Sequence, residues 1–243
     1  YYIDESGVIL NKDKLFLYGC IKTDSPDDIE SFFVSLKEFL INQAYFENVR
    51  QDLLNRNFHA VDDHFDVRTR IYEKLPLLNF RAYFVILNKG SKYFSNIKDQ
   101  GEAKIIEIML KKLVLPRLRK NRDESNHFIF EEKIIQNGSL QEILNSIFSP
   151  FENYDLSFKI VDKQNINLAI VDYFNYLIFN IYKNIICKKK STEQEVFKFN
   201  LLKEKIGFIE VIGDDFKYLS RLGNSSNSIT LEKMKDLYLI KTT

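Results

Sequence analysis

The chain reads Phe80-Arg81-Ala82-Tyr83-Phe84-Val85-Ile86-Leu87, followed at once by Asn88-Lys89-Gly90. Aromatic and β-branched side chains of this kind fit a pleated, buried surface, and a polar segment with glycine is typical of the turn that ends a strand. We therefore predict a strand over residues 80–87. The elements on either side of it determine the fold class.

Helical and extended patterns alternate on both sides of this strand. Upstream, two β-prone runs around a polar turn predict a hairpin, and Ser25-Pro26 opens a helix with apolar residues at helical spacing. Residues 45–75 show no clean period. Downstream, a helix over residues 102–115 is expected to break near Pro116, and the other predicted elements are strands at 127–130, 156–161 and 207–212 and helices at 141–148 and 166–186.

This order predicts an α/β fold with a central mixed sheet flanked by helices. We assign residues 1–187 to the main domain. Residues 188–243 are expected to form a C-terminal extension packed on the same domain, with a Ser/Asn/Gly-rich loop at residues 223–228.

Composition excludes several classes of protein. The 243 residues are 45% hydrophobic and 28% charged, which is an ordinary globular balance. Lys and Arg number 35 against 34 for Asp and Glu, so the chain is not a histone-like coat protein, although a local basic patch is compatible with nucleic acid. The two cysteines exclude a disulfide framework and a cysteine-ligated zinc site, and they favour a cytoplasmic location.

No segment has the pattern of a membrane anchor. The most apolar stretch, residues 166–181, is interrupted by Asn167, Asp172, Asn175 and Asn180, and a lipid-spanning helix rarely carries so many polar groups. The opening residues are acidic and lack the basic region of a secretory signal. We therefore expect no membrane partner.

Three acidic residues stand where burial is costly. Asp4 and Glu131 each end a predicted strand, a position from which active-site side chains project in α/β sheets and at which loops also begin. Asp172 lies on a helix that is apolar almost all round, where a carboxylate costs several kcal/mol unless it is compensated. Asp172 is therefore either paired with an Arg or Lys from elsewhere or a metal ligand.

Together the three carboxylates suit a divalent cation. Mg²⁺ prefers oxygen ligands and is held by one or two carboxylates together with substrate phosphates. Two such ions on either side of a scissile phosphodiester form the two-metal arrangement of many nucleases. We expect Mg²⁺ or Mn²⁺ as the cofactor.

Four segments resemble a known family. Tyr2-Ile3-Asp4-Glu5-Ser6-Gly7 is similar to the I-D-E-S-G signature of the domain-of-unknown-function family 3800, bacterial proteins with a ribonuclease H-like fold. Further similar segments are Phe58-His59-Ala60-Val61-Asp62-Asp63, Phe128-Ile129-Phe130-Glu131-Glu132 and Asn167-Leu168-Ala169-Ile170-Val171-Asp172-Tyr173. The resemblance covers about residues 1–187 and implies a ribonuclease H-like sheet.

The same resemblance implies roles for individual residues. Asp4, Glu131 and Asp172 would be the metal-binding acids, with Glu5 beside them. In this chain the strand predicted at residues 127–130 is followed by Glu131-Glu132, where the superfamily usually has Asp. It is therefore open which of the two glutamates is the ligand. The helix has Leu168 where the family has Gln, so one supporting contact is expected to be absent.

The segment around His59 has two interpretations. His59, with Asp63 and the neighbouring Asp62 and His64, could supply a general base, a water-positioning group or an extra ligand. Alternatively, the two aspartates belong to a solvated loop and His59 is an ordinary polar residue.

A basic run also has two interpretations. On a helix it could follow a phosphate backbone, or it could be the solvated face of an amphipathic helix. The residues concerned are Lys111, Lys112, Arg117, Arg119, Lys120 and Arg122.

The functional hypothesis follows from the acids. We predict a metal-dependent nuclease that hydrolyses DNA or RNA, for example in a bacterial defence or mobile-element system. The alternative is a catalytically silent ribonuclease H-like module that binds a protein or nucleic-acid partner.

Overall fold

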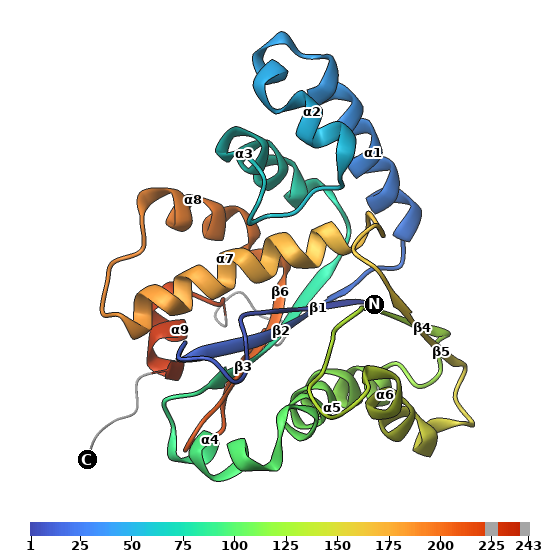
Figure 1. Cartoon of the computed structure of the whole chain (residues 1–243), viewed down its shortest axis with the longest axis vertical. Helices are drawn as coiled ribbons and strands as arrows, with labels where there is room; N and C mark the ends of the chain where they lie inside the picture. Colours follow the sequence, from blue (N-terminus) through green and yellow to red (C-terminus); the bar gives the residue numbers. More distant parts are fainter. Residues whose placement is uncertain (222–227, 239–243) are drawn as a thin grey trace.

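The computed structural model describes residues 1–221 and 228–238 and shows an α/β protein built on one mixed sheet (Figure 1). The predicted fold class, a mixed sheet flanked by helices, is confirmed. The strand order is β5-β4-β1-β2-β3-β6-β7. The strands are β1 (Tyr2–Ser6), β2 (Leu15–Lys22), β3 (Arg81–Asn88), β4 (Asn126–Glu131), β5 (Leu156–Val161), β6 (Ile206–Ile212) and β7 (Lys217–Ser220).

The strand order reverses beside β1. The chain leaves β1 through the antiparallel hairpin to β2 and on to β3, with Asp4 opposite Gly19. It then returns to the other side of β1, where β4 pairs in parallel with Ile3 opposite Phe130, and β5 follows β4. In open α/β sheets such a reversal leaves a crevice at the carboxyl ends of the strands, and ligands bind there.

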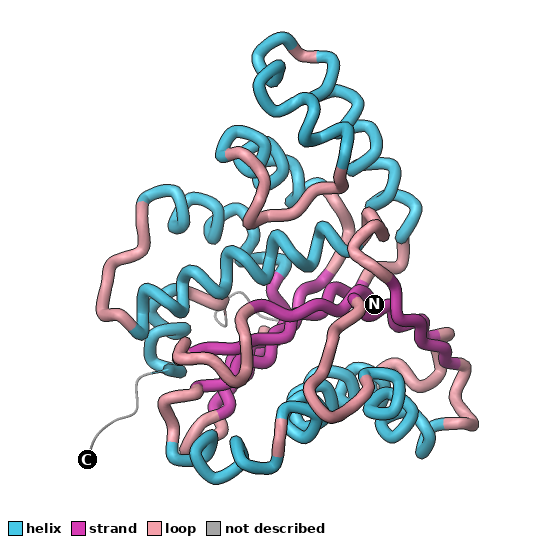
Figure 2. Tube along the Cα trace, in the orientation of Figure 1, coloured by secondary structure: helices cyan, strands magenta, loops and turns pink. Residues whose placement is uncertain are grey.

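Helices cover both faces of the sheet, and each face has its own apolar core (Figures 1 and 2). Successive strand residues point to opposite faces, so Tyr2 joins one core and Ile3 the other. One side carries α1 (Pro26–Asn42), α2 (Glu47–Asn55), α3 (Phe65–Lys74), α7 (Leu168–Ile186), α8 (Glu193–Leu202) and α9 (Leu231–Tyr238). The other carries α4 (Lys92–Ile97), α5 (Glu102–Lys120) and α6 (Leu140–Phe148).

Helix α7 runs along β1 in the middle of its layer. Its side chains are apolar on most sides, and it is buried accordingly. Two asparagines fix its register against β1: Asn167 Nδ2 donates to the Tyr2 hydroxyl at 2.8 Å, and Asn175 Nδ2 donates to the Asp4 carbonyl at 3.0 Å. None of the helices in the described ranges is long and apolar enough to cross a membrane.

Three details differ from the sequence-based expectation. Helix α5 does not break near Pro116 but continues to Lys120, because Arg117 and Leu118 beyond the proline are buried and their packing offsets the lost backbone hydrogen bond. Residues 45–75, which show no clean period, contain α2 and α3. Beyond residue 187 the chain adds α8, β7 and α9 as well as the expected strand β6, and β6 pairs in parallel with β3.

The domain boundary at residue 187 stays a prediction. Residues 223–227 of the expected Ser/Asn/Gly-rich loop lie outside the described residues.

Candidate functional site

Asp4 and Glu131 lie on the same face of the sheet, under α7. Alternation along β1 places Asp4 on the face of Tyr2, and alternation along β4 places Glu131 on the face of Ile129, which packs against the same core. Because Ile3 pairs with Phe130, the next residues along the two parallel strands are Asp4 and Glu131. The two acids therefore stand side by side where the strand order reverses.

Asp4 is a buried carboxylate, with only 5% of its surface exposed. Its Oδ1 accepts a hydrogen bond from its neighbour's backbone, Glu5 N, at 2.7 Å. Burial raises the pKa of Asp4 well above its usual range, and the negative charges of Glu5, Glu131 and Asp172 raise it further. The charged form of Asp4 is thus disfavoured at this position, and a bound cation would relieve that cost.

Asn175 positions Asp4 from α7. Its Nδ2 donates to the Asp4 carbonyl and lies 3.5 Å from Asp4 Oδ2. This approach is possible because Gly19 stands opposite on β2: a Cβ at Gly19 would lie 1.9 Å from Asn175 Oδ1. Neither role was predicted from the sequence, although an asparagine one turn after Asp172 on an otherwise apolar helix was a usable signal.

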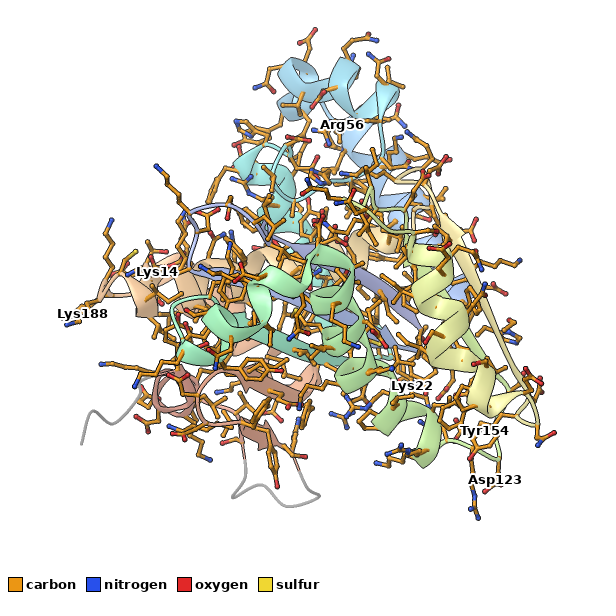
Figure 3. The ribbon with its side chains drawn as sticks, turned by 60° about the horizontal axis from the view of Figure 1, so that its bottom comes forward. Lys14, Lys22, Arg56, Asp123, Tyr154 and Lys188 are labelled. Atoms are coloured by element: carbon orange, nitrogen blue, oxygen red, sulfur yellow. The ribbon has the colours of Figure 1, made fainter. Side chains whose placement is uncertain are left out.

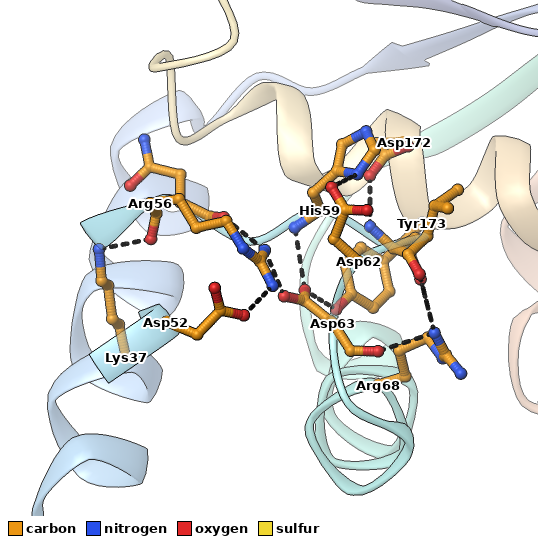
Figure 4. Close-up of polar contacts among 12 residues, drawn as sticks. Lys37, Asp52, Arg56, His59, Asp62, Asp63, Arg68, Asp172 and Tyr173 are labelled. Carbon is orange, nitrogen blue, oxygen red and sulfur yellow. Dashed lines mark hydrogen bonds and ion pairs between the residues drawn. The ribbon is translucent and has the colours of Figure 1, made fainter. Parts of the chain in front are cut away.

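Asp172 reaches the same region from α7. Its Oδ2 accepts a hydrogen bond from Ala60 N at 2.6 Å, and Figure 4 shows His59 beside it. Burial raises the pKa of Asp172 to about 6, against the opposing effects of His59 and the Ala60 N–H. In the part of the chain that the structure describes, no Lys or Arg lies within 4 Å of its carboxylate, so the structural ion pair considered from the sequence is not formed.

Glu131, rather than Glu132, faces the other two acids. The Glu131 side chain is 13% exposed, and its carboxylate lies 3.5 Å from Lys163 Nζ. Lys163 follows β5 and is 68% exposed, so its ammonium is free to move into solvent. Glu132 is exposed and uses its backbone N–H to bond Val161 at 2.8 Å.

Glu5 lies on the opposite face of the sheet. Its carboxylate pairs with Lys133 Nζ at 2.6 Å, and Lys133 in turn lies over the Phe16 ring of the other core. Burial raises the pKa of Glu5, while Lys133 lowers it. Glu5 therefore follows Asp4 along β1 but points to the opposite face from the three acids, and its negative charge raises the pKa of Asp4.

The predicted site residue Asp63 is a structural anchor for the His59 loop (Figure 4). Only 3% of its surface is exposed. Its Oδ1 accepts from Arg56 Nη1 at 2.7 Å, and its Oδ2 accepts from His59 N at 2.9 Å and from the Tyr173 hydroxyl. With both oxygens engaged, Asp63 holds the loop against α7 and has no capacity to bind substrate.

His59 itself lies at the rim. Its side chain is 33% exposed, and its Nδ1 lies 3.0 Å from the exposed carboxylate of Asp62. Arg68 ties down the same loop by donating to the carbonyls of Ala60 at 2.9 Å and Asp63 at 2.7 Å. The loop thus presents the Ala60 N–H and the His59 ring to Asp172.

The anchoring role of Asp63 predicts a stability effect. We expect Asp63→Asn to destabilise the protein by about 2 kcal/mol, because the partly buried Arg56 loses its better-shielded partner and keeps only the exposed Asp52. Asp62→Asn, at a 61% exposed position in the same loop, should change stability by less than about 0.5 kcal/mol. Urea unfolding measures both, and equal effects would contradict the assignment.

The basic residues on α5 do not form one solvated stripe. Lys111 pairs with Glu107, Lys112 pairs with Glu210, and Arg117 is buried. Arg119 and Lys120 are exposed. Because α5 lies on the other side of the sheet from α7, none of them faces Asp4 or Asp172.

The three acids on the α7 face fit a divalent cation in their chemistry. All three offer carboxylate oxygens, and the raised pKa values of Asp4 and Asp172 show that their ionised forms are disfavoured, a cost that a bound cation would relieve. Within the described ranges, however, no three His, Cys, Asp or Glu side chains are already gathered closely enough to hold a metal ion. The three residues have the right ligand atoms for a metal ion and lie on the same face of the sheet. Binding an ion would require their carboxylates to move closer to each other.

No protein-family model matches the chain, and no curated protein matches it in sequence. The functional argument therefore depends on the site.

Proposed function

We propose that the chain is a divalent-metal-dependent nuclease that hydrolyses phosphodiester bonds of DNA or RNA. One observation carries the proposal. Three acids from β1, β4 and α7 share one face where the strand order reverses, and burial with mutual repulsion raises the pKa of two of them. Perturbed acids in such a position are typical of functional sites.

The sheet supports a ribonuclease H-like relationship. Strands β5-β4-β1-β2-β3 form a run in which β2 alone is antiparallel, a mixed sheet of the kind that the resemblance to family 3800 implies. The strands that carry Asp4 and Glu131 are parallel neighbours, so the two acids lie side by side on one face. With the four segments similar to family 3800, this order supports placing residues 1–187 in that superfamily.

Asp4, Glu131 and Asp172 would hold Mg²⁺ or Mn²⁺, which supplies a Lewis acid and lowers the pKa of a bound water. Asn175 and the Glu5 N–H keep Asp4 in place, and the Ala60 N–H fixes the rotamer of Asp172. His59 stands at the exposed rim, where its ring can accept a proton or orient a water. Lys163 can leave Glu131 and contact a substrate phosphate, since its side chain is mostly exposed.

A silent binding module is the second candidate, and Lys163 is the observation that favours it. Its ammonium already lies against Glu131 and reduces the need for a metal at that carboxylate. In such a module the acids would be stabilised by Lys163 and by protonation, and the partner would be a protein or nucleic acid.

A cleavage assay separates the two candidates. We expect purified protein to cut labelled single-stranded or double-stranded DNA or RNA with Mg²⁺ or Mn²⁺ and to be inactive with chelator. Glu132→Gln is the matched control because Glu132 is exposed and points away from Asp4, and it should retain full activity. The nuclease proposal fails if no substrate is cut and added metal leaves the melting temperature unchanged.

A further inference from the structure

A basic groove lies at the far end of the sheet from the acids. Its volume is about 830 Å³, and it is lined where β2 and β7 end, where β3 and β6 begin, and by the last turns of α5. Asp4 and Glu131 lie instead toward the carboxyl ends of β1 and β4. The groove is therefore separate from the proposed metal centre.

The charge of the groove is mostly positive. Lys22 is paired with Glu124 at 2.9 Å, and Arg221 is paired with Glu204. Figure 3 shows Lys22 beside the last turns of α5, where it also donates to Asn121 at 3.0 Å. The charged lining residues are Lys22, Arg81, Arg117, Lys120, Arg221 and a single acid, Asp24.

Three of these cations keep their charge uncompensated. Over the described ranges, no carboxylate oxygen lies within 4 Å of the basic groups of Arg81, Arg117 or Lys120. Arg81 Nη1 donates to the neutral carbonyl of Glu204 at 2.8 Å, and Lys120 is exposed at the rim.

Arg117 is the strongest sign of a ligand. Only 9% of its surface is exposed, and its guanidinium lies 4.3 Å from the centre of the Tyr83 ring and 4.9 Å from that of Phe208. Its buried Nη1 has no hydrogen-bond partner among the described residues. An unsatisfied buried donor costs free energy, and a guanidinium packed over two neighbouring aromatic rings is prepared for bidentate bonding to a phosphate.

We propose that this groove binds the phosphate of a nucleotide, either free or within a strand, with Arg117 as the buried anchor and Arg81 and Lys120 at the rim. Its volume falls within the 300–1,000 Å³ range, roughly, of small-ligand pockets, which is more than a bare phosphate needs. Asn79 and Ser220 add hydrogen-bonding groups for a sugar or base. Arg117 and Lys120, singled out from the sequence, thus belong to a groove rather than to a helix stripe.

Binding is tested with a 5′-fluorescein-labelled ten-residue oligothymidylate by fluorescence anisotropy in EDTA, which keeps the acid centre free of metal. We expect the Arg81→Gln/Lys120→Gln double variant to weaken binding about tenfold or more and to reduce its salt dependence. Arg119→Gln is the matched control, because Arg119 is exposed on the same helix but does not line the groove, and it should stay within about twofold. Equal losses in the control, or no binding at all, overturn the proposal.

Arg117→Met tests the anchor directly. Methionine can cover the same two rings and removes the buried charge, so we expect binding to be lost while the melting temperature holds or rises. A fall in melting temperature with binding intact would make Arg117 a structural residue and overturn the proposal.

Competition identifies the source of the phosphate. Displacement of the probe by adenosine monophosphate indicates a free nucleotide, and displacement only by unlabelled oligonucleotide indicates a strand. If inorganic phosphate displaces the probe as well as adenosine monophosphate or the oligonucleotide does, the groove is not a nucleotide site. Asp172→Asn should bind the probe as the unmodified protein does, so the groove and the metal centre can fail independently.

Discussion

Asp172→Asn is expected to abolish metal-dependent cleavage and, without metal, to leave the protein as stable or more stable at neutral pH. Asparagine retains the side-chain oxygen that accepts the Ala60 N–H, and it removes a carboxylate that has no Lys or Arg partner among the described residues. A structural ion-pair residue would behave in the opposite way, because its loss would leave a buried cation and cost about 3–5 kcal/mol.

The raised pKa of Asp172 also predicts how the stability of the protein depends on pH. The pKa of Asp172 is raised to about 6 in the folded protein, so protonated Asp172 favours folding. Its contribution is complete below about pH 4 and is lost as the pH rises through 6, a loss on the order of 3 kcal/mol. The raised pKa of Asp4 acts in the same direction. Metal-free Asp172→Asn should therefore lose less stability than the unmodified protein between pH 4 and pH 7.

Added metal should make the unmodified protein more stable to heat than Asp172→Asn. Mg²⁺ binds ionised carboxylates, so above pH 6 it should raise the melting temperature of the unmodified protein and leave Asp172→Asn unchanged. Thermal melts at several pH values, with metal or EDTA, measure both effects. A variant that melts far below the unmodified protein in EDTA, with an unchanged response to metal, contradicts Asp172 as a ligand.

Gly19→Ala is expected to be strongly destabilising, by about 3 kcal/mol. The new Cβ would lie 1.9 Å from Asn175 Oδ1 and 3.1 Å from the Phe84 ring. Asn175 would have to turn away, which breaks its hydrogen bond to the Asp4 carbonyl and leaves buried polar groups unpaired. The metal response should weaken with it, because Asp4 loses its support from α7.

Gly213→Ala is the matched control for this substitution. The nearest atoms to a Cβ at Gly213 lie at 3.6 Å, an ordinary contact, so urea unfolding should show a change within about 0.5 kcal/mol. The double variant Gly19→Ala/Asn175→Ala should be less destabilised than the sum of its single variants, since Asn175→Ala removes the clashing atom. Strict additivity would mean that the cost arises elsewhere.

Local patterns predicted the strands other than β7, the helices α1, α5, α6 and α7, and the three acids of the candidate site. The run at residues 80–87 forms β3, and the acids at the ends of β1 and β4 were visible because each follows apolar strand residues. Asp172 was visible because it interrupts an apolar helix. Each of these features depends on residues that are close together in the sequence, within one helical turn or one strand, so it can be recognised without the structure.

The remaining features depend on contacts between distant residues. The separation of Glu5 from Asp4 follows from strand alternation combined with a helix layer on each face, and Lys133 completes it from 128 residues away. The Gly19–Asn175 approach joins β2 to α7, and the anchoring of Asp63 requires Arg56 and Tyr173 together. The proline in α5 was misread because the packing of Arg117 and Leu118 beyond it, which offsets its cost, depends on residues far away in the chain.

Anomalous diffraction from crystals soaked in Mn²⁺ tests the central claim most directly. We predict an anomalous peak bonded by carboxylate oxygens of Asp4, Glu131 and Asp172, with the Lys163 ammonium displaced from Glu131, and no such peak in crystals of Asp172→Asn. Crystals that bind Mn²⁺ elsewhere, while Lys163 stays against Glu131 and the three carboxylates stay apart, would contradict a shared metal centre.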